Sequence, residues 1–322
     1  MAPVSELIAK DLALLEQSIE QLLTTKVAFI REVVHHIIKS GGKRIRPVLV
    51  ILSAKMCGAQ DHKHIPYAAI IEFIHTATLL HDDVVDNAKI RRGRLTANTI
   101  WGNEPSVLVG DFLFTKSFDL MVQIENSEVL KVMSAATTSL AEGEIMELLK
   151  TSDLNTSEAE YFEVIANKTA VLIAAACEMG AILGNADAQR RNALRQFGHH
   201  LGMAFQLKDD FLDYVSTDST LGKNVGIDLK EGKVTLPLIH TLRHSTPEER
   251  EIITTAFEKS KTTKRDFQKV KKIIEKYGGL AYTENVSKQH VDSAKEFLAL
   301  FSPSPYRDAL RDLATYIITR ET

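Results

Sequence analysis

The distribution of proline is the feature that most limits how this chain can fold. Its 322 residues include only eight prolines, and none lies between Ser106 and Leu236. A proline in a helix interior costs about 3 kcal/mol, so long helices exclude it. Mostly apolar residues recur in this span at the helical period of three or four, as in the series Leu108, Phe112, Thr115, Phe118, Met121 and Val122. Because alternating, strand-like segments are missing, the sequence predicts an all-α protein with helices longer than the usual ~11 residues.

Polar and glycine-containing stretches divide the chain into helical segments without marking a domain boundary. No low-complexity linker or shift in composition separates these segments, so we expect a single domain over residues 1–322. The longest break, residues 216–233, contains three glycines and three lysines and is typical of a flap over a site. The predicted breaks are residues 40–47, 57–66, 90–98, 124–128, 150–160, 216–233, 244–249 and 301–307.

Composition and charge exclude several classes of function. The net charge of −3 and the pI near 6.4 argue against a broad nucleic-acid surface. No basic segment followed by an apolar segment marks a signal peptide at the start, and the apolar run 170–177 is far shorter than the ~20 residues that span a bilayer. We therefore expect a cytoplasmic protein. Cys57 and Cys177 lie in apolar helical sequence, which predicts reduced core thiols and argues against a disulfide or a thiolate zinc site.

The pattern D-D-x-x-D occurs twice, and each copy follows apolar helical sequence. One copy is a weak signal, since acidic turns are common on surfaces, but two copies beside apolar faces indicate a site. Residues i and i+4 share one face of a helix, so each copy crowds carboxylates that repel one another unless a cation neutralises them. Oxygen ligands without cysteine or several histidines suit Mg²⁺. The aspartates are Asp82, Asp83 and Asp86 in the first motif, and Asp209, Asp210 and Asp213 in the second.

Basic residues beside glycines and acidic clusters complete this picture. Arginine and lysine bind phosphate oxygens, and arginine does so with two parallel hydrogen bonds. Each cation alone is more typical of a solvated surface, but together they predict a helical, Mg²⁺-dependent enzyme that acts on diphosphates with an apolar remainder. The cations are Lys43, Arg44 and Arg46 in "GGKRIRP", Arg91 and Arg92 after the first motif, Lys168 beside Thr169 in "NKTA", and Lys223, Lys230 and Lys233 in the flap.

At this point the chain resembles the trans-prenyltransferases, the isoprenyl diphosphate synthase family, over nearly its whole length. The sequence of its motifs is most similar to that of the long-chain, octaprenyl type. The resemblance implies a bundle of long helices around a central cavity. The motifs that carry it are, in order, "GGKRIRP", "EFIHTATLLHDDVVD", "RRG", "SVLVGDFLFTKSF", "EGEIMEL", "NKTA", "GMAFQLKDDFLDY" and "LGKNVGIDLKEGKVTLPLI".

The resemblance also implies roles for individual residues. Both aspartate motifs would bind Mg²⁺, three ions per active site with diphosphate bound, and Asp82, Asp83, Asp86, Lys168, Asp209, Asp210 and Lys223 would carry the catalysis. The allylic diphosphate would contact Arg91, Lys168, Thr169, Gln206, Lys208, Lys223 and Lys233, although the position of Lys208 varies in the family. The diphosphate of isopentenyl diphosphate would contact Lys43, Arg46, His75 and Arg92. Without the resemblance, His75 is more typical of a polar residue on a half-buried helix than of a binding residue.

The implied reaction is ionisation, condensation and elimination. The allylic diphosphate leaves with the help of Mg²⁺ and the lysines, isopentenyl diphosphate attacks the resulting cation, and a proton is lost to the released diphosphate. Water must be excluded because it would quench the cation, so the flap 216–233 is the expected lid.

Small residues before the first motif predict a long product. Ala77 and Thr78 lie about one helical turn before Asp82, where bulky side chains stop the tail in short-chain members of the family. We therefore expect a product of about C40, made from an allylic primer such as farnesyl diphosphate, with Phe118 or Met121 forming the floor of its tunnel. The family further implies a homodimer and a product that is delivered to the membrane as a quinone side chain.

Four alternatives remain open at this stage. One is a geranylgeranyl synthase that stops at C20, and another is a non-catalytic subunit of a heteromeric synthase, which the intact motifs disfavour. A third is an HD-type phosphohydrolase that uses His81 and Asp82 with His35 and His36, but it leaves the second aspartate motif unexplained. The fourth is a terpene cyclase, in which a different triad usually replaces that second motif.

Overall fold

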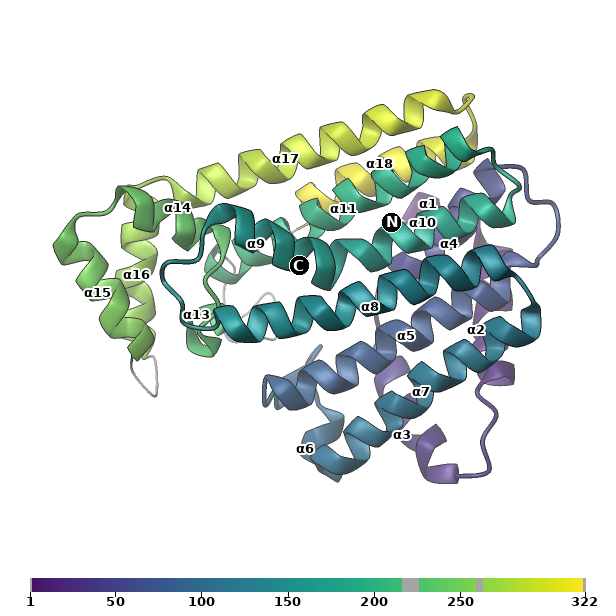
Figure 1. The fold of residues 1–322 in the computed structure, drawn as a ribbon, viewed down its shortest axis with the longest axis horizontal. Coiled ribbons are helices and arrows are strands. Elements are labelled where there is room, and N and C mark those ends of the chain that lie inside the picture. Colours follow the sequence, from purple (N-terminus) through teal and green to yellow (C-terminus); the bar gives the residue numbers. More distant parts are fainter. Residues whose placement is uncertain (1, 216–225, 259–262, 321–322) are drawn as a thin grey trace. The chain divides into compact units, whose positions relative to one another are not determined.

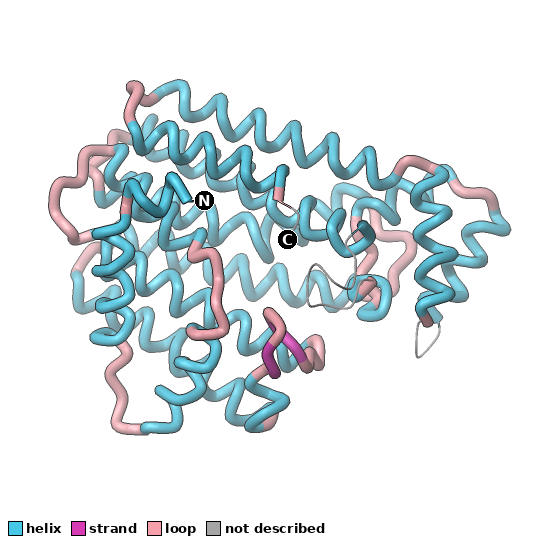
Figure 2. Tube along the Cα trace, turned by 180° about the vertical axis from the view of Figure 1, so that it is seen from behind, coloured by secondary structure: helices cyan, strands magenta, loops and turns pink. Residues whose placement is uncertain are grey.

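The computed structural model describes residues 2–215, 226–258 and 263–320, which are almost entirely helical, so the predicted all-α class is confirmed (Figures 1 and 2). The α-helices are α1 (Ala2–Leu7), α2 (Ala9–Leu22), α3 (Ala28–Ile38), α4 (Ile45–Met56), α5 (His64–Val85), α6 (Ala97–Trp101), α7 (Asn103–Ile124), α8 (Ser127–Lys150), α9 (Glu158–Ile165), α10 (Val171–Leu183), α11 (Ala188–Val215), α13 (Ile227–Glu231), α14 (Leu236–His244), α15 (Pro247–Glu258), α16 (Lys264–Lys276), α17 (Gly279–Phe297) and α18 (Pro305–Thr319). The remaining elements are the strands β1 (Ile90–Arg91) and β2 (Arg94–Leu95), a π-helical turn (Ala166–Ala170) and a 3₁₀ turn (Leu298–Leu300).

The prolines explain where many of these helices begin. Proline fits the first turn of a helix because its missing N–H would have no partner there. Seven of the eight prolines lie within the first three residues of a helix, and Pro303 lies in the loop before α18. The seven are Pro3, Pro47, Pro66, Pro105, Pro237, Pro247 and Pro305.

The chain forms two compact units, and each is built from three separate segments. Unit 1 comprises Met1–Ala135, Ala175–Arg195 and Leu298–Leu313. Unit 2 comprises Ala136–Ala174, Gln196–Phe297 and Ala314–Thr322. The single domain over residues 1–322 stays a prediction.

In unit 1, helix α5 is the central element. It packs against α2, α4 and α7, and the residues from Tyr67 to Ile74 are all buried. A helix covered on all sides needs no polar face, which explains the nearly continuous apolar run in its first half. The consequence for function is that the C-terminal end of α5, with the first aspartate motif, is held on a rigid core element.

In unit 2, the core lies around α14, which packs against α9, α16 and α17. Tyr214 at the end of α11 stacks on Phe267 of α16, with 5.9 Å between ring centres. Ser157 and Glu160 form a reciprocal capping box that starts α9. Such a box satisfies backbone N–H groups that the first helical turn leaves without partners. It therefore fixes the start of the helix that contributes to the pocket described below.

A small hairpin corrects the expectation that strands would be missing. Strands β1 and β2 pair antiparallel, with Ile90 opposite Leu95 and Arg91 opposite Arg94. Both turn residues have positive φ, 52° at Arg92 and 74° at Gly93, as two-residue hairpin turns require. The sequence did not reveal the hairpin because strands of two residues are too short for an alternating pattern.

The two cysteines are free thiols, as predicted. Cys177 is buried and Cys57 is half-buried. Burial raises the pKa of Cys177 to about 12 and that of Cys57 to about 11. Both groups therefore remain protonated at neutral pH, and the protonated thiol is the unreactive form.

Among the described residues, one helical stretch, Glu158–Leu183, has the length and apolar composition of a membrane-spanning segment. Most of its apolar part is buried within the protein.

Candidate active site

The first aspartate motif lies at the C-terminal end of α5, in unit 1. Asp83 is buried, and its Oδ1 accepts a hydrogen bond of 2.8 Å from Nε of Arg91. Asp82 and Asp86 are half-buried and stand one turn apart. The three carboxylates are therefore not equivalent. Asp82 and Asp86 share a face, as predicted, whereas the Asp83 carboxylate is used to hold the arginine that follows the motif.

The hairpin and the "GGKR" loop meet in unit 1. The guanidinium of Arg92 donates to the backbone carbonyl of Gly41. A Cβ added at Gly42 would come within 2.8 Å of the Arg92 guanidinium, so a larger residue there would displace the arginine head group. Two motifs that are distant in sequence thus converge through an arginine and a glycine pair.

His75 lies one to two turns before the motif and is half-buried. Burial lowers the pKa of His75 well below its ordinary value, and the charges of Arg46 and Arg92 add to this effect. His75 is therefore neutral at physiological pH and lies among arginines, which is the environment of an anion site. The charges of Arg46 and Arg92 act on His75, so the three side chains lie near one another, while Lys43 is exposed on the loop before α4. Their role in binding a diphosphate stays a prediction.

Arg44 has a different role from its neighbours. It has a positive φ of 49° before α4 and pairs with Glu72 at 2.5 Å and Glu16 at 3.5 Å. These contacts link α4 to α5 and α2. Arg44 therefore serves the fold, and the anion-binding role of Lys43 and Arg46 in this stretch stays a prediction.

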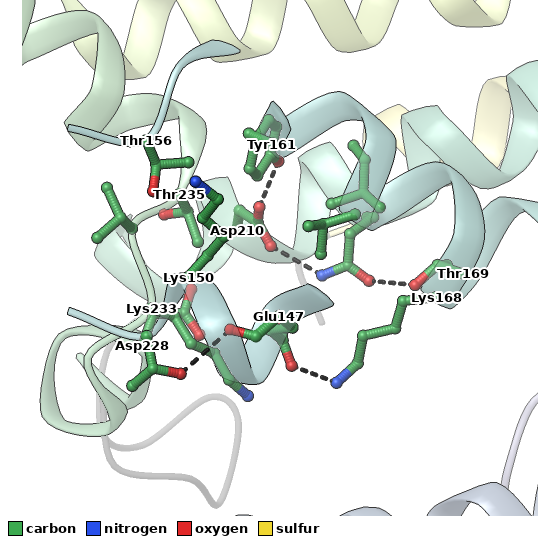
Figure 3. Close-up of a pocket in the computed structure, with 15 residues that line it drawn as sticks. Glu147, Lys150, Thr156, Tyr161, Lys168, Thr169, Asp210, Asp228, Lys233 and Thr235 are labelled. Atoms are coloured by element: carbon green, nitrogen blue, oxygen red, sulfur yellow. Dashed lines mark hydrogen bonds and ion pairs between the residues drawn. The ribbon is translucent and has the colours of Figure 1, made fainter. Parts of the chain in front are cut away.

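The second aspartate motif contributes to a pocket that lies entirely within unit 2 (Figure 3). Gln206 accepts a hydrogen bond from Thr169 and donates one to Asp210 Oδ1, both at 2.8 Å. The hydroxyl of Tyr161 donates to the other oxygen, Asp210 Oδ2, at 2.5 Å. The Asp210 carboxylate is thus held at both oxygens. The pocket is lined by Glu147, Lys150, Thr151, Thr156, Tyr161, Val164, Ile165, Lys168, Thr169, Gln206, Asp210, Asp228, Lys233, Val234 and Thr235.

The electrostatics of this pocket favour a bound cation. Burial raises the pKa of Asp210 to about 7, and the charges of Asp209 and Glu147 act in the same direction. Burial and the charge of Asp213 raise the pKa of Asp228 well above its usual range. A divalent cation would relieve this repulsion. The lining residues offer oxygen ligands and include no cysteine or histidine, so the donor set fits Mg²⁺.

The raised pKa of Asp210 predicts a pH dependence of stability in the metal-free protein. Between about pH 4 and pH 7 the folded state holds a proton that the unfolded chain has released, so stability falls as pH rises through this window. We expect the unfolding temperature of the wild type to fall by several degrees relative to Asp210→Asn between pH 5 and pH 8. Thermal scans with a chelator check this. Asp292→Asn, at an exposed site in unit 2, is the control, and parallel curves for wild type and Asp210→Asn would contradict the prediction.

Lys168 and Thr169 lie in the π-helical turn Ala166–Ala170, between α9 and α10. Such turns bulge a helix locally and are frequent at functional sites. Lys168 Nζ is ion-paired with Glu144 at 2.8 Å and with Glu147. At Gly143 a Cβ would come within 2.6 Å of the backbone nitrogen of Lys168, so α8 can approach the turn only with glycine there.

Lys233 and Asp213, two further predicted site residues, have different partners. Lys233 lines the pocket and pairs with Glu231 at 2.8 Å. Asp213 accepts hydrogen bonds from the backbone N–H groups of Ile227 and Asp228, at 3.1 and 3.2 Å, and so caps α13.

Lys208 and Lys223 are the remaining predicted contacts of the allylic diphosphate in this part of the chain. Lys208 is buried, with its ammonium 4.5 Å from the centre of the Phe211 ring, and it is not among the residues that line the pocket. Lys223 and the first part of the flap, residues 216–225, lie outside the described residues.

The predicted tunnel residues lie on two helices of unit 1 that pack together, α5 and α7. Ala77 is fully buried, and Thr78 is half-buried and donates to the carbonyl of His75 at 2.9 Å. Met121 is buried, and the half-buried Phe118 contacts Phe114, with 5.5 Å between ring centres. Their role in product length stays a prediction.

Sequence reasoning missed several residues that line the pocket of unit 2 or lie beside it. Glu144 and Glu147 lie within "EGEIMEL", and Asp228 lies within "GIDLKEGK", so the quoted motifs already contained them. Tyr161 had no such signal, because a tyrosine on a helix is ordinarily a core residue. Its role depends on a contact with Asp210, 49 positions later.

The geometry argues against the phosphohydrolase alternative. His35 contacts Glu20 at 3.0 Å, and His36 contacts the carbonyl of Leu95 at 2.8 Å. His81 lies 3.2 Å from Asp111. Each histidine that a metal phosphohydrolase would need beside Asp82 is thus engaged with a different partner.

Comparison with known proteins agrees with the family that the motifs indicate. A model of the family described as Polyprenyl synthetase matches residues 27–275. The chain is 42% identical to octaprenyl diphosphate synthase of Escherichia coli (strain K12) over 318 residues, which cover 99% of this chain and 98% of that protein. It is 41% identical to an all-trans-nonaprenyl-diphosphate synthase of Rhodobacter capsulatus, with 97% and 96% covered.

Solved structures agree with the sequence relatives. A polyprenyl synthase from Caulobacter crescentus CB15, complexed with calcium and isoprenyl diphosphate, matches with a TM-score of 0.96 and 42% identity, covering 100% of this chain and 98% of that one. A decaprenyl diphosphate synthase from Rhodobacter capsulatus matches with a TM-score of 0.93 and 40% identity, covering 98% and 97%. With intact motifs and relatives matched over nearly their full length, the chain belongs to the polyprenyl synthetase family, and it is a prenyltransferase of the trans type.

Proposed function

We propose that the chain is a long-chain trans-polyprenyl diphosphate synthase that extends an allylic diphosphate, such as farnesyl diphosphate, with isopentenyl diphosphate to about C40. The observation that carries this proposal is the 42% identity, over almost the entire length, to an octaprenyl diphosphate synthase. The small residues Ala77 and Thr78 before the first motif agree with a long product.

The arginine cluster of unit 1 is the proposed site for the diphosphate of isopentenyl diphosphate. The guanidinium groups of Arg46 and Arg92 can each bind the oxygens of an anion through two parallel hydrogen bonds. His75, kept neutral by burial and by these arginines, can donate a hydrogen bond to an oxygen of the diphosphate. The flexible backbone at Gly41 and Gly42 lets the Arg92 side chain approach the loop.

The pocket of unit 2 is the proposed site for part of the allylic diphosphate. Lys168 and Lys233 present ammonium groups there, and Glu144 and Glu147 hold Lys168 in place. These cations stabilise the negative charge that develops on the departing diphosphate.

The aspartates of each motif would hold Mg²⁺, with three ions per active site as the proposed count. When bound, Mg²⁺ would neutralise diphosphate oxygens and so lower the barrier to departure. Asp210 is already oriented for this role by Tyr161 and Gln206.

A homodimer is the proposed assembly. On α8, Ile145, Leu148 and Leu149 share one helical face and are exposed, Leu149 to 77%. A second copy of the chain would cover such apolar side chains. Sedimentation should give about twice the 35.8 kDa of one chain. We also propose that the enzyme acts in the cytoplasm and that its apolar product passes to the membrane as a quinone side chain.

Product analysis tests the proposed function. The purified protein is incubated with Mg²⁺, isopentenyl diphosphate and farnesyl diphosphate, and the dephosphorylated alcohols are separated by length. We expect products near C40 and none when Mg²⁺ is chelated. A stop at C20 would make the enzyme a geranylgeranyl synthase, which the long-chain relatives disfavour, and the absence of any transfer would overturn the proposal.

A further inference from the structure

Arg320, directly after α18, reaches the second aspartate motif. Its Nη2 lies 2.7 Å from Oδ1 of Asp209 and donates to the backbone carbonyl of Phe205 at 3.0 Å. Its Nε donates to the carbonyl of Ile317 at 3.3 Å, and its Cζ lies 4.1 Å from the centre of the Phe205 ring. All of these residues lie in unit 2.

These contacts fix the guanidinium in one place. The Arg320 side chain is only 6% exposed, whereas that of Asp209 is 41% exposed. A buried arginine is costly unless it is paired and hydrogen-bonded, and here a ring face, two carbonyls and a carboxylate satisfy it together. Arg320 is therefore a rigid anchor, and the more exposed Asp209 carboxylate is the group whose orientation depends on it.

We propose that Arg320 is a positioning residue that orients the Asp209 carboxylate for cation binding. This inference rests on the proposed function of the second motif. The guanidinium holds Oδ1 of Asp209, and the second oxygen, Oδ2, is the atom that would bind the cation. Partners that hold a metal-ligating side chain typically contribute ten- to a hundredfold to metal affinity.

Two effects of Arg320 oppose each other. Its positive charge repels a divalent cation, whereas its hydrogen bond removes the rotational freedom of Asp209. Orientation is expected to outweigh repulsion here, because the Asp209 carboxylate is 41% exposed and solvent screens the arginine charge, whereas without the hydrogen bond the exposed side chain could rotate. Removal of Arg320 is therefore expected to weaken binding of Mg²⁺, and lysine, which keeps the charge but not the planar fork, should restore it only in part.

The test is a Mg²⁺ titration of the protein with inorganic pyrophosphate as the diphosphate probe. The readout is the rise in unfolding temperature as Mg²⁺ binds, and its midpoint gives the Mg²⁺ affinity. We expect the Mg²⁺ midpoint to rise roughly tenfold or more in Arg320→Met, and less in Arg320→Lys. A purely structural role would lower the unfolding temperature without moving the midpoint. Arg265→Met, at an exposed arginine of α16 in the same unit, is the control and should match the wild type.

The outcomes separate this inference from the proposed function. If the wild type transfers prenyl groups and responds to Mg²⁺ but both Arg320 variants share its midpoint, the positioning role is wrong. If Arg320→Met does not fold, the lysine variant decides, since an unchanged midpoint there also overturns the role. If the wild type neither transfers prenyl groups nor responds to Mg²⁺, the proposed function fails first.

Discussion

Replacement of Asp82 by asparagine is expected to lower kcat for prenyl transfer about a thousandfold. The change keeps the size of the side chain and removes one carboxylate from the face that Asp82 shares with Asp86. If that face holds a cation that neutralises the leaving diphosphate, the loss corresponds to about 4 kcal/mol of transition-state stabilisation. Asp82 is half-buried at the end of α5, so the fold should persist.

The measurement is the rate of isopentenyl diphosphate incorporation at saturating Mg²⁺, together with the unfolding temperature. Asp61→Asn removes the same charge from an exposed loop before α5 and serves as the matched control. Retention of more than a tenth of the wild-type rate by Asp82→Asn would show that this carboxylate is not a metal ligand in the reaction.

The second large effect concerns product length. Ala77→Tyr is expected to shift the product from about C40 to C20 or shorter, because an aromatic ring would stand about one helical turn from the first aspartate motif. An extended C40 chain is on the order of 35 Å long, comparable to a helix of roughly 23 residues. The tail therefore needs a path along a long helix such as α5, and a ring near the start of that path would block it.

Folding has to be checked in this variant because Ala77 is fully buried in unit 1. Overpacking a core typically costs about 1–3 kcal/mol. Ala77→Leu is a smaller step that should shorten the product less, and Ala77→Gly adds no bulk and should leave the length unchanged. Chromatography of the dephosphorylated alcohols decides. A folded Ala77→Tyr protein with the wild-type product distribution would place the tunnel elsewhere.

The sequence by itself determined the all-α class and the membership in a family. Helical periodicity and the placement of proline are local properties, since they act within one or two turns, so the all-α class and many of the breaks between helices could be predicted. The two aspartate motifs could also be found, because the convergence of residues four apart on a helix needs no tertiary contact.

Only the tertiary structure decided how equivalent-looking residues are used. Asp83 is buried and accepts a hydrogen bond from Arg91, whereas Asp82 and Asp86 are half-buried. Arg44 pairs with Glu72, whereas the charge of Arg46 acts on His75. The spacing within a motif contains no information about these choices. They depend on which other segment packs against the motif.

The same reason explains the residues that sequence reasoning missed. Tyr161 meets Asp210 across 49 positions, and Arg320 meets Asp209 across 111. Burial then sets the pKa of Asp210 to about 7, a value that no local pattern predicts. Local chemistry thus determined which groups the chain offers, and long-range packing determined which of them are oriented, paired or forced to share a cation.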